Sequence, residues 1–292
     1  MLERYGAKVT KVGAGEVGGA PSLQEVEAVL ESAKPKLMTI THVDTSTGVA
    51  TNVKGLAALG RKHEALVIVD GVCAVGGEVM RQDDWGIDVA LTASQKAIGV
   101  PPGLALLVAG PKAMEKFKNR KSLVSNFYAD WHEWLPIMQA YESRKPSYFG
   151  TPAVNLVWAL HVSLQEILRE GMEARFTRHT RLGNSFKAAV KALGLKQVPL
   201  RPELYATTLS AIYYPEGVDA SMLKHVDEAG VLVAGGLHPA IKTKYFRVGH
   251  MGAVTEADIL ATVGAVETGL KKSGYQFEVG SGIAAAQKAL SN

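Results

Sequence analysis

The sequence predicts an α/β fold with a large, mainly parallel sheet, followed by a small α+β unit. Its 292 residues are 47% hydrophobic and 21% charged, which suits one large globular domain or a large and a small one. Short apolar runs alternate with segments of helical periodicity over the first half of the chain, as they do when crossover helices join parallel strands. After about residue 171 the pattern changes to mixed strands and helices.

The first half contains five short apolar runs that predict strands: Ala7–Val12, Leu37–Thr41, Ala65–Asp70, Ile87–Thr92 and Leu104–Ala109. Between them, residues 22–32 and 53–63 have helical periodicity. The first of these helices opens with Ser22 followed three residues later by Glu25, the spacing of a capping box. A third helix is expected after Pro111.

A long aromatic stretch at residues 122–150 interrupts this alternation. Thr151 and Pro152 then suit the N-cap and first position of a helix that runs to about Arg169. A second helix is predicted over residues 171–192. We therefore expect a large domain over residues 1–170 and a small C-terminal α+β domain over residues 171–292.

The C-terminal unit has its own strand and helix signals. The segments YATTLSAIYY, VLVAG and KYFRVG predict strands, and residues 219–229 and 255–271 predict helices. From Gly274 onward the chain is rich in small residues, which suggests a loosely held helix or tail. At the other end, Leu2 to Gly6 resembles the last turn of a helix and its terminal glycine, so we expect the chain to begin inside a domain.

Composition excludes several classes of protein. No apolar run reaches the roughly 18 residues of a membrane span, and the N-terminal residues lack the pattern of a secretory signal. The net charge of +4 is scattered, so we expect neither a nucleic-acid nor a membrane partner. A single cysteine excludes an internal disulfide and a cysteine-based zinc site, and no other metal site is expected. The expected location is intracellular, with cytoplasm, peroxisome and mitochondrion all open.

The stretch from Gly13 to Gly18 matches the dinucleotide fingerprint G-x-G-x-x-G. That motif requires a helix to open at its third glycine, so that the N-terminus of the helix faces the pyrophosphate. Here the helix signal comes only at Ser22. We interpret the stretch as a flexible loop.

Two charged residues follow neighbouring apolar runs. Asp70 ends one predicted strand, and Lys96 comes shortly after the next, within the apolar segment around Ala97 and Ile98. Ligands of open α/β sheets bind outside the carboxyl ends of the strands, so both side chains are expected to face one crevice. A desolvated lysine amine is a nucleophile for carbonyl groups. Pyridoxal phosphate requires such a lysine, and a carboxylate at its ring nitrogen.

The motifs VDGVCAVGG, SQKAIGVPPG, THVDTSTGV and KYFRVGHMG, in separate parts of the chain, resemble the class V aminotransferases. Within that class they are most similar to the alanine–glyoxylate/serine–pyruvate aminotransferase family. The resemblance implies a type I pyridoxal-phosphate-dependent transferase fold, a homodimer, and amino-group transfer from a small amino acid such as alanine or serine to a 2-oxo acid such as glyoxylate or pyruvate. It also implies that Lys96 binds pyridoxal 5′-phosphate covalently and that Asp70 contacts its ring nitrogen.

Five further residues match family positions. By resemblance, Thr45 lies near the phenolic oxygen of the cofactor and Gln95 contacts its phosphate. Arg247 occupies the place of the arginine that binds the substrate carboxylate, and a planar guanidinium can hold a carboxylate with two hydrogen bonds. Tyr148 and Thr151 match residues that reach the cofactor phosphate of the neighbouring subunit. From the residues alone, Arg247 could equally be a surface arginine, and Thr151 a helix cap.

In this family about a third of the chain precedes the position of Met1, including a glycine-rich phosphate loop and an aromatic residue stacked on the cofactor. We therefore expect a large domain that is incomplete on its N-terminal side, with weakened cofactor binding. Two alternatives stay open: a catalytically incompetent homologue that acts as a binding partner, and another class V reaction on the same cofactor, such as an epimerase or a lyase. A cysteine desulfurase requires a cysteine on a mobile loop, whereas the single Cys73 reads as a core residue.

Overall fold

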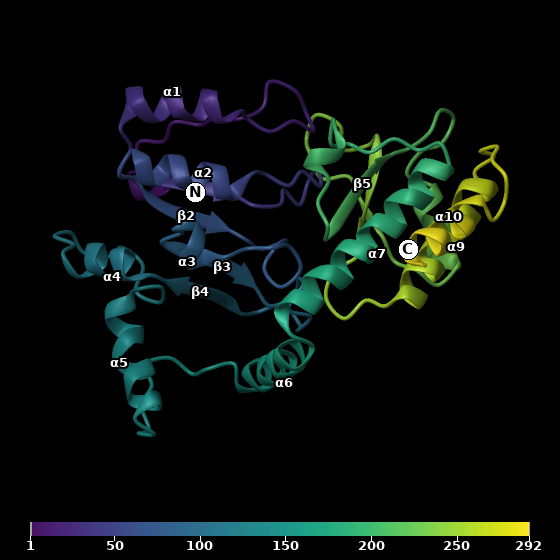
Figure 1. Cartoon of the computed structure of the whole chain (residues 1–292). Helices are drawn as coiled ribbons and strands as arrows, with labels where there is room; N and C mark the ends of the chain where they lie inside the picture. Colours follow the sequence, from purple (N-terminus) through teal and green to yellow (C-terminus); the bar gives the residue numbers. More distant parts are fainter. Residues whose placement is uncertain (1, 292) are drawn as a thin grey trace.

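The computed structural model describes residues 2–291, which form helices and strands in the order shown in Figure 1. The helices are α1 (Leu23–Ala33), α2 (Val53–Lys62), α3 (Gln82–Trp85), α4 (Pro111–Lys118), α5 (Trp131–Glu142), α6 (Val154–Glu170), α7 (Met172–Ala192), α8 (Met222–Glu228), α9 (Glu256–Lys272) and α10 (Ser281–Leu290), with short 3-10 turns at Leu2–Tyr5 and Pro202–Leu204. The strands are β1 (Leu37–Thr41), β2 (Leu66–Asp70), β3 (Val89–Ala93), β4 (Ala105–Ala109), β5 (Leu209–Tyr213), β6 (Ala234–Gly235) and β7 (Tyr245–Gly249).

A mixed, mainly parallel sheet forms the first half of the molecule. Its strand order is β1-β2-β3-β4, in which β1, β2 and β3 are parallel and β4 is antiparallel. The register places Thr41 beside Asp70 and Asp70 beside Leu91. The carboxyl ends of the three parallel strands therefore lie along one edge, and in Figure 1 this edge faces the part of the molecule that contains α7 and β5.

The sheet is held by an apolar core between it and the helices α1 and α2. The alternation in β2 buries Val67 and Val69 completely. These residues pack with the buried faces of α1, through Leu30, and of α2, through Leu56 and Ala57. The helix α1 begins where the sequence predicts, because Ser22 and Glu25 form the expected capping box.

The C-terminal half has a separate core. Its sheet has the order β5-β7-β6, and all pairs are antiparallel. The helix α7 packs against β5, and α9 and α10 pack against α7, with a core that includes Phe186, Phe246 and Leu270. The α+β composition predicted for this half is thus present. The proposed boundary between residues 170 and 171 stays a prediction.

Several predicted elements differ from the structure. Residues 7–12 form no strand, because that run has no neighbouring strand with which to pair among the described residues. Thr151 and Pro152 do not begin the long helix, which starts at Val154 after Ala153 as N-cap. Of the segment VLVAG, only Ala234–Gly235 is a strand, and it is an edge strand.

The C-terminal tail is also better held than expected. Helix α10 buries Gly282, Ala286 and Leu290, mainly against α7. The carboxylate of Glu267 fixes its start by accepting hydrogen bonds from the backbone N–H groups of Gly280 and Gly282, each at 2.8 Å. Small residues in this tail therefore allow close packing. No helix among residues 2–291 is both long and apolar enough to cross a membrane.

Candidate active site

Asp70 lies at the carboxyl edge of the parallel strands, and Lys96 lies just beyond that edge. Asp70 is the last residue of β2, and its Oδ1 accepts a hydrogen bond from the backbone N–H of Val72 at 3.0 Å. Although Asp70 ends an apolar strand, it is exposed. Neither Asp70 nor Lys96 forms an ion pair within the described residues. Both charged groups therefore remain available to a ligand.

The loop that carries Lys96 is a tight turn. The backbone N–H of Gly99 donates to the carbonyl of Lys96 at 2.8 Å, and that of Val100 donates to the carbonyl of Ser94 at 3.0 Å. Gly99 has a φ of 78°, which favours glycine at this position. Ala97 and Ile98 are buried, Lys96 is half-buried and Gln95 is exposed. The turn thus anchors its apolar residues in the core and leaves its polar residues outside.

Thr45 lies in a second ordered loop, between β1 and α2. The carboxylate of Asp44 organises this loop by accepting hydrogen bonds from Ser46 and from the hydroxyl of Thr47. Burial acts to raise the pKa of Asp44, but these hydrogen bonds outweigh it and hold the pKa below its usual value. The hydroxyl of Thr45 lies 2.9 Å from the Cys73 sulfur, so the loop contacts the segment that follows Asp70.

Arg247 connects this loop to the C-terminal half. It lies in the central strand β7, where Nε donates to the carbonyl of Gly235 at 2.9 Å and Nη1 donates to the carbonyl of Thr45 at 3.1 Å. A guanidinium has five N–H groups, and these bonds use two of them. The others can bind a carboxylate. The structure therefore brings Arg247 and Thr45 together, as expected if both belong to one site.

Tyr245 also connects the Thr45 loop to the C-terminal half, and the sequence analysis did not predict this role. Its hydroxyl donates to the carbonyl of Ser46 and accepts hydrogen bonds from the backbone N–H groups of Leu237 and His238, both at 2.8 Å. The motif KYFRVG contains both Tyr245 and Arg247, two residues apart on one face of the strand. That spacing could have indicated that Tyr245 lies on the same face as Arg247. A buried tyrosine in a strand is, however, usually a core residue.

Tyr148 and Thr151 lie elsewhere. Both are in the connection between α5 and α6, which in Figure 1 runs along the side of the molecule beyond β4. Tyr148 is 71% exposed, and Thr151 is also exposed. Within the described residues, neither is hydrogen-bonded to another predicted site residue. Their role toward a neighbouring subunit stays a prediction.

The geometry at Cys73 bears on the desulfurase alternative. This single cysteine is 1% exposed and packs with Val43, Ala74 and Ala206. A buried thiol in a packed core cannot reach a substrate in the way that a nucleophile on a mobile loop does. Cys73 is a core residue, as the sequence suggested.

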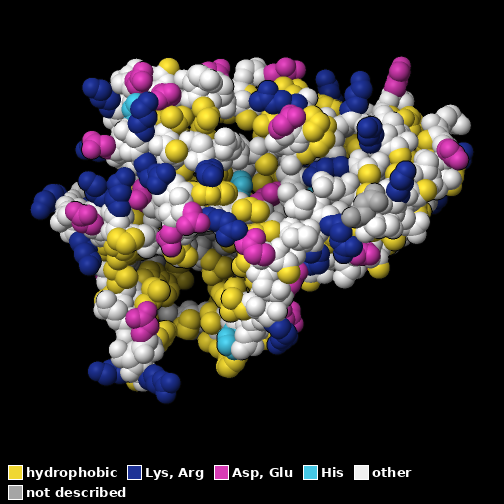
Figure 2. Space-filling view, in the orientation of Figure 1, with side chains coloured by type: hydrophobic (Ala, Val, Ile, Leu, Met, Phe, Trp, Pro, Cys, Tyr) yellow, Lys and Arg dark blue, Asp and Glu magenta, His cyan; other side chains and the backbone are white. Residues whose placement is uncertain are grey.

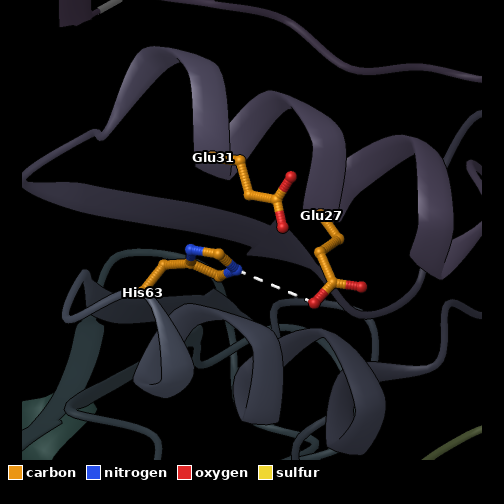
Figure 3. Close-up of side chains that lie close together, drawn as sticks. All are labelled: Glu27, Glu31 and His63. Carbon is orange, nitrogen blue, oxygen red and sulfur yellow. Dashed lines mark ion pairs between the residues drawn. The ribbon is translucent and has the colours of Figure 1, made fainter.

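Glu27, Glu31 and His63 could offer ligand atoms to a cation, because these atoms lie within 4.8 Å of one another (Figure 3). The two carboxylates come from α1, and His63 follows α2. The ammonium of Lys62 lies 2.5 Å from the Glu27 carboxylate and already supplies a positive charge there. We interpret the group as an ion-pair contact between α1 and α2.

Comparison with known proteins identifies the family. A sequence model of the family "Aminotransferase class-V" matches residues 1–261. L-aspartate–glyoxylate aminotransferase of Paracoccus denitrificans is 36% identical over 99% of this chain and 72% of its own length. Serine–glyoxylate aminotransferase of Arabidopsis thaliana is 38% identical, over 86% of this chain and 62% of its own length. The chain belongs to the class V aminotransferases.

A solved structure agrees with this assignment. Ureidoglycine–glyoxylate aminotransferase of Bacillus subtilis superposes with a TM-score of 0.91 at 26% identity, over 99% of this chain and 74% of that one. This likeness confirms the predicted α/β transferase fold. The chain thus spans between 62% and 74% of the length of these three proteins.

Family membership confirms pyridoxal 5′-phosphate as the expected cofactor. The residues present fit that group on their chemistry: an aspartate for the ring nitrogen, a lysine for the aldehyde, and a threonine hydroxyl that contacts Cys73 in the segment after Asp70. Asp70 ends β2 and Lys96 follows β3, and these two strands are neighbours in the sheet. These residues are therefore chemically suited to hold the cofactor.

Proposed function

We propose that this chain carries out amino-group transfer from a small amino acid, such as alanine or serine, to glyoxylate or pyruvate. The observation that supports the proposal is the junction at which Arg247 contacts the Thr45 loop, beside the strand edge that carries Asp70 and Lys96. The three similar proteins described above all carry glyoxylate in their names, but with aspartate, serine or ureidoglycine as the partner compound. Glyoxylate is therefore the best-supported acceptor, and the donor is the more variable substrate.

Each residue then has a distinct task. The guanidinium of Arg247 binds the substrate carboxylate and so orients the Cα–H bond. The Nζ of Lys96 would act as the general base that takes the proton from Cα of the substrate. With pyridoxal phosphate bound, the Asp70 carboxylate would lie against the ring nitrogen of the cofactor and keep that nitrogen protonated. Pyridoxal phosphate, when bound, supplies the aldehyde that accepts the amino group and an electron sink for the carbanion.

We also propose that the chain acts as a homodimer. Helix α6 exposes Val154, Val157, Trp158 and Leu168, with Trp158 65% exposed. Figure 2 shows hydrophobic side chains gathered around the hollow between α5 and α6. Exposed apolar surface of this kind is typical of subunit contacts. Tyr148, in the adjoining connection, would then face the neighbouring subunit. Light scattering on the purified chain measures its mass in solution.

The function is tested first by covalent capture of the cofactor. The purified chain is mixed with pyridoxal 5′-phosphate, reduced with borohydride and digested, and the modified peptide is identified by mass spectrometry. We expect modification at Lys96, its loss in Lys96→Ala, and its retention in Lys54→Ala, a control at an exposed lysine on α2. Equal, weak modification of many lysines, with no preference for Lys96, would favour the catalytically incompetent alternative.

A further inference from the structure

A cluster of charged residues and a histidine at the α6–α7 junction contacts the loops around both proposed catalytic residues. It consists of Arg175, Arg178 and His179 on one turn of α7, with Glu170 at the end of α6; we call these four residues the α7 clamp. Arg175 is 5% exposed and His179 is fully buried. A buried arginine needs partners for its charge and its N–H groups, and its partners therefore identify what it holds.

The Arg175 guanidinium makes one hydrogen bond from each nitrogen. Nε donates to the carbonyl of Gly76 at 2.7 Å, Nη2 donates to the carbonyl of Ala97 at 2.6 Å, and Nη1 donates to Glu170 at 2.9 Å. Gly76 belongs to the compact turn that follows Asp70, and Ala97 is the residue after Lys96. One planar group therefore fixes the two loops relative to each other.

The close approach at Gly77 supports this reading. A Cβ atom at Gly77 would lie 2.4 Å from the side chain of Thr208, 3.2 Å from His179 and 3.5 Å from Ala97. The turn after Asp70, the lysine loop and α7 thus meet with no space between them. In such packing, a change in the Arg175 contacts shifts both loops.

The rest of the clamp holds a third segment, between β7 and α9. Arg178 donates to the carbonyls of Gly252 and Val254, at 3.0 and 2.8 Å. The backbone N–H of Gly252 donates to Nε2 of His179 at 2.9 Å, so Nε2 is unprotonated. Nδ1 then carries the proton and donates to the carbonyl of Arg175 at 2.8 Å. Burial lowers the pKa of His179 to about 4, which agrees with a neutral ring.

We propose that Arg175 is a positioning residue that sets the separation between Asp70 and Lys96. This inference rests on the proposed function, because the separation matters when the carboxylate and the amine must reach opposite ends of one cofactor ring. Misplacement of a reacting group by about 1 Å can cost about a hundredfold in rate. Lysine at position 175 would keep the positive charge but could not direct three donors to three fixed acceptors.

The test compares Arg175→Lys with Arg181→Ala. Arg181 lies on the same helix but is 43% exposed and pairs with Glu256 at the surface. Two readouts are taken on each variant: hydrogen exchange of the segments 71–78 and 94–100 in the cofactor-free chain, and the rate of borohydride-fixed modification of Lys96 by pyridoxal 5′-phosphate. Thermal unfolding checks that each variant is folded.

We expect Arg175→Lys to fold but to unfold at a lower temperature than the wild type, because some of the three buried acceptors lose their donor. We expect it to exchange faster in both segments and to lose about tenfold or more in Lys96 modification. Arg181→Ala should change neither readout. Unchanged exchange and modification in Arg175→Lys would overturn the proposal, as would faster exchange spread evenly over the chain. If the wild type itself is not modified at Lys96, the proposed function fails, and the exchange data alone decide whether Arg175 orders the two loops.

Discussion

At the residue scale, Arg247 has both a structural and a proposed substrate-binding role. It donates to two backbone carbonyls, and we propose that it also binds the substrate carboxylate. We expect Arg247→Ala to raise the KM for the amino donor by about 10- to 100-fold, the loss of one charged hydrogen-bonding partner. Tyr245→Phe is the control, because it removes a neighbouring contact with the Ser46 carbonyl and leaves the guanidinium in place. Steady-state kinetics distinguish them, and an equal rise in KM for both variants would argue against carboxylate binding.

The contacts of single residues were the feature that could be predicted least from the sequence. Asp70 and Lys96 could be predicted because each follows an apolar run, and strand ends in open sheets meet ligands. The contacts that hold the loops around Asp70 and Lys96 could not be predicted. Arg175 donates to Gly76 and Ala97, which lie 99 and 78 residues away in the sequence. No local pattern indicates such partners, and arginine on a helix is usually at the surface.

At the scale of single elements, α9 offers a clean test of local stability. Thr255 and Asp258 form a capping box at its start. We expect Thr255→Ala to lower the free energy of unfolding by about 1 kcal/mol, because an orphan N–H of the first turn loses its acceptor. Thr268→Ala, at an exposed position within the same helix, is the matched control and should change this free energy by less than about 0.5 kcal/mol. Urea unfolding of both variants measures this, and equal effects would contradict the role of the cap.

Element predictions succeeded where periodicity and capping agreed. The helix α1 follows its capping box, and the strands β1 and β2 match their apolar runs. The run at residues 7–12 failed because a strand requires a neighbour, which the run itself cannot specify. The α6 start failed because Thr151 and Pro152 satisfy the local rule for a helix start, while the structure begins the helix at Val154.

At the scale of the whole molecule, three buried histidines predict acid sensitivity. Burial lowers the pKa of His42 to about 4, of His179 to about 4 and of His250 to about 3. Between pH about 6.5 and about 4, the unfolded chain binds protons that the folded chain does not. The free energy of unfolding should therefore fall as the pH falls, by about 1.4 kcal/mol per pH unit for each histidine.

Urea titrations at a series of pH values measure that slope. His250→Gln should reduce it, since His250 is fully buried and its Nδ1 has no hydrogen-bond partner within the described residues. His161→Gln, at an exposed position on α6, is the control for the substitution itself. A free energy of unfolding that stays constant from pH 6.5 to 4.5 would contradict the account.

Glu170 should contribute to this pH dependence only at more acidic pH, because the hydrogen bond from Arg178 holds the pKa of Glu170 below the usual value.

The overall architecture could be predicted from alternation of element types, since parallel strands with crossover helices leave a repeated pattern. The junction between the two halves could not, because it depends on single contacts such as those of the Glu78 carboxylate with the backbone N–H groups of Thr207 and Thr208. Burial acts to raise the pKa of Glu78, and these N–H groups act against it. The site depends on this junction, since Arg247 and Thr45 come from opposite sides of it.

The most direct test of the proposed activity follows the amino nitrogen itself. The chain is supplied with pyridoxal 5′-phosphate, glyoxylate, and serine or alanine carrying an isotope-labelled amino group, and the products are analysed by mass spectrometry. We predict labelled glycine from the wild type and none from Lys96→Ala. If Lys96 takes up the cofactor but no labelled glycine forms with either donor, or with aspartate, the proposed amino transfer to glyoxylate is wrong.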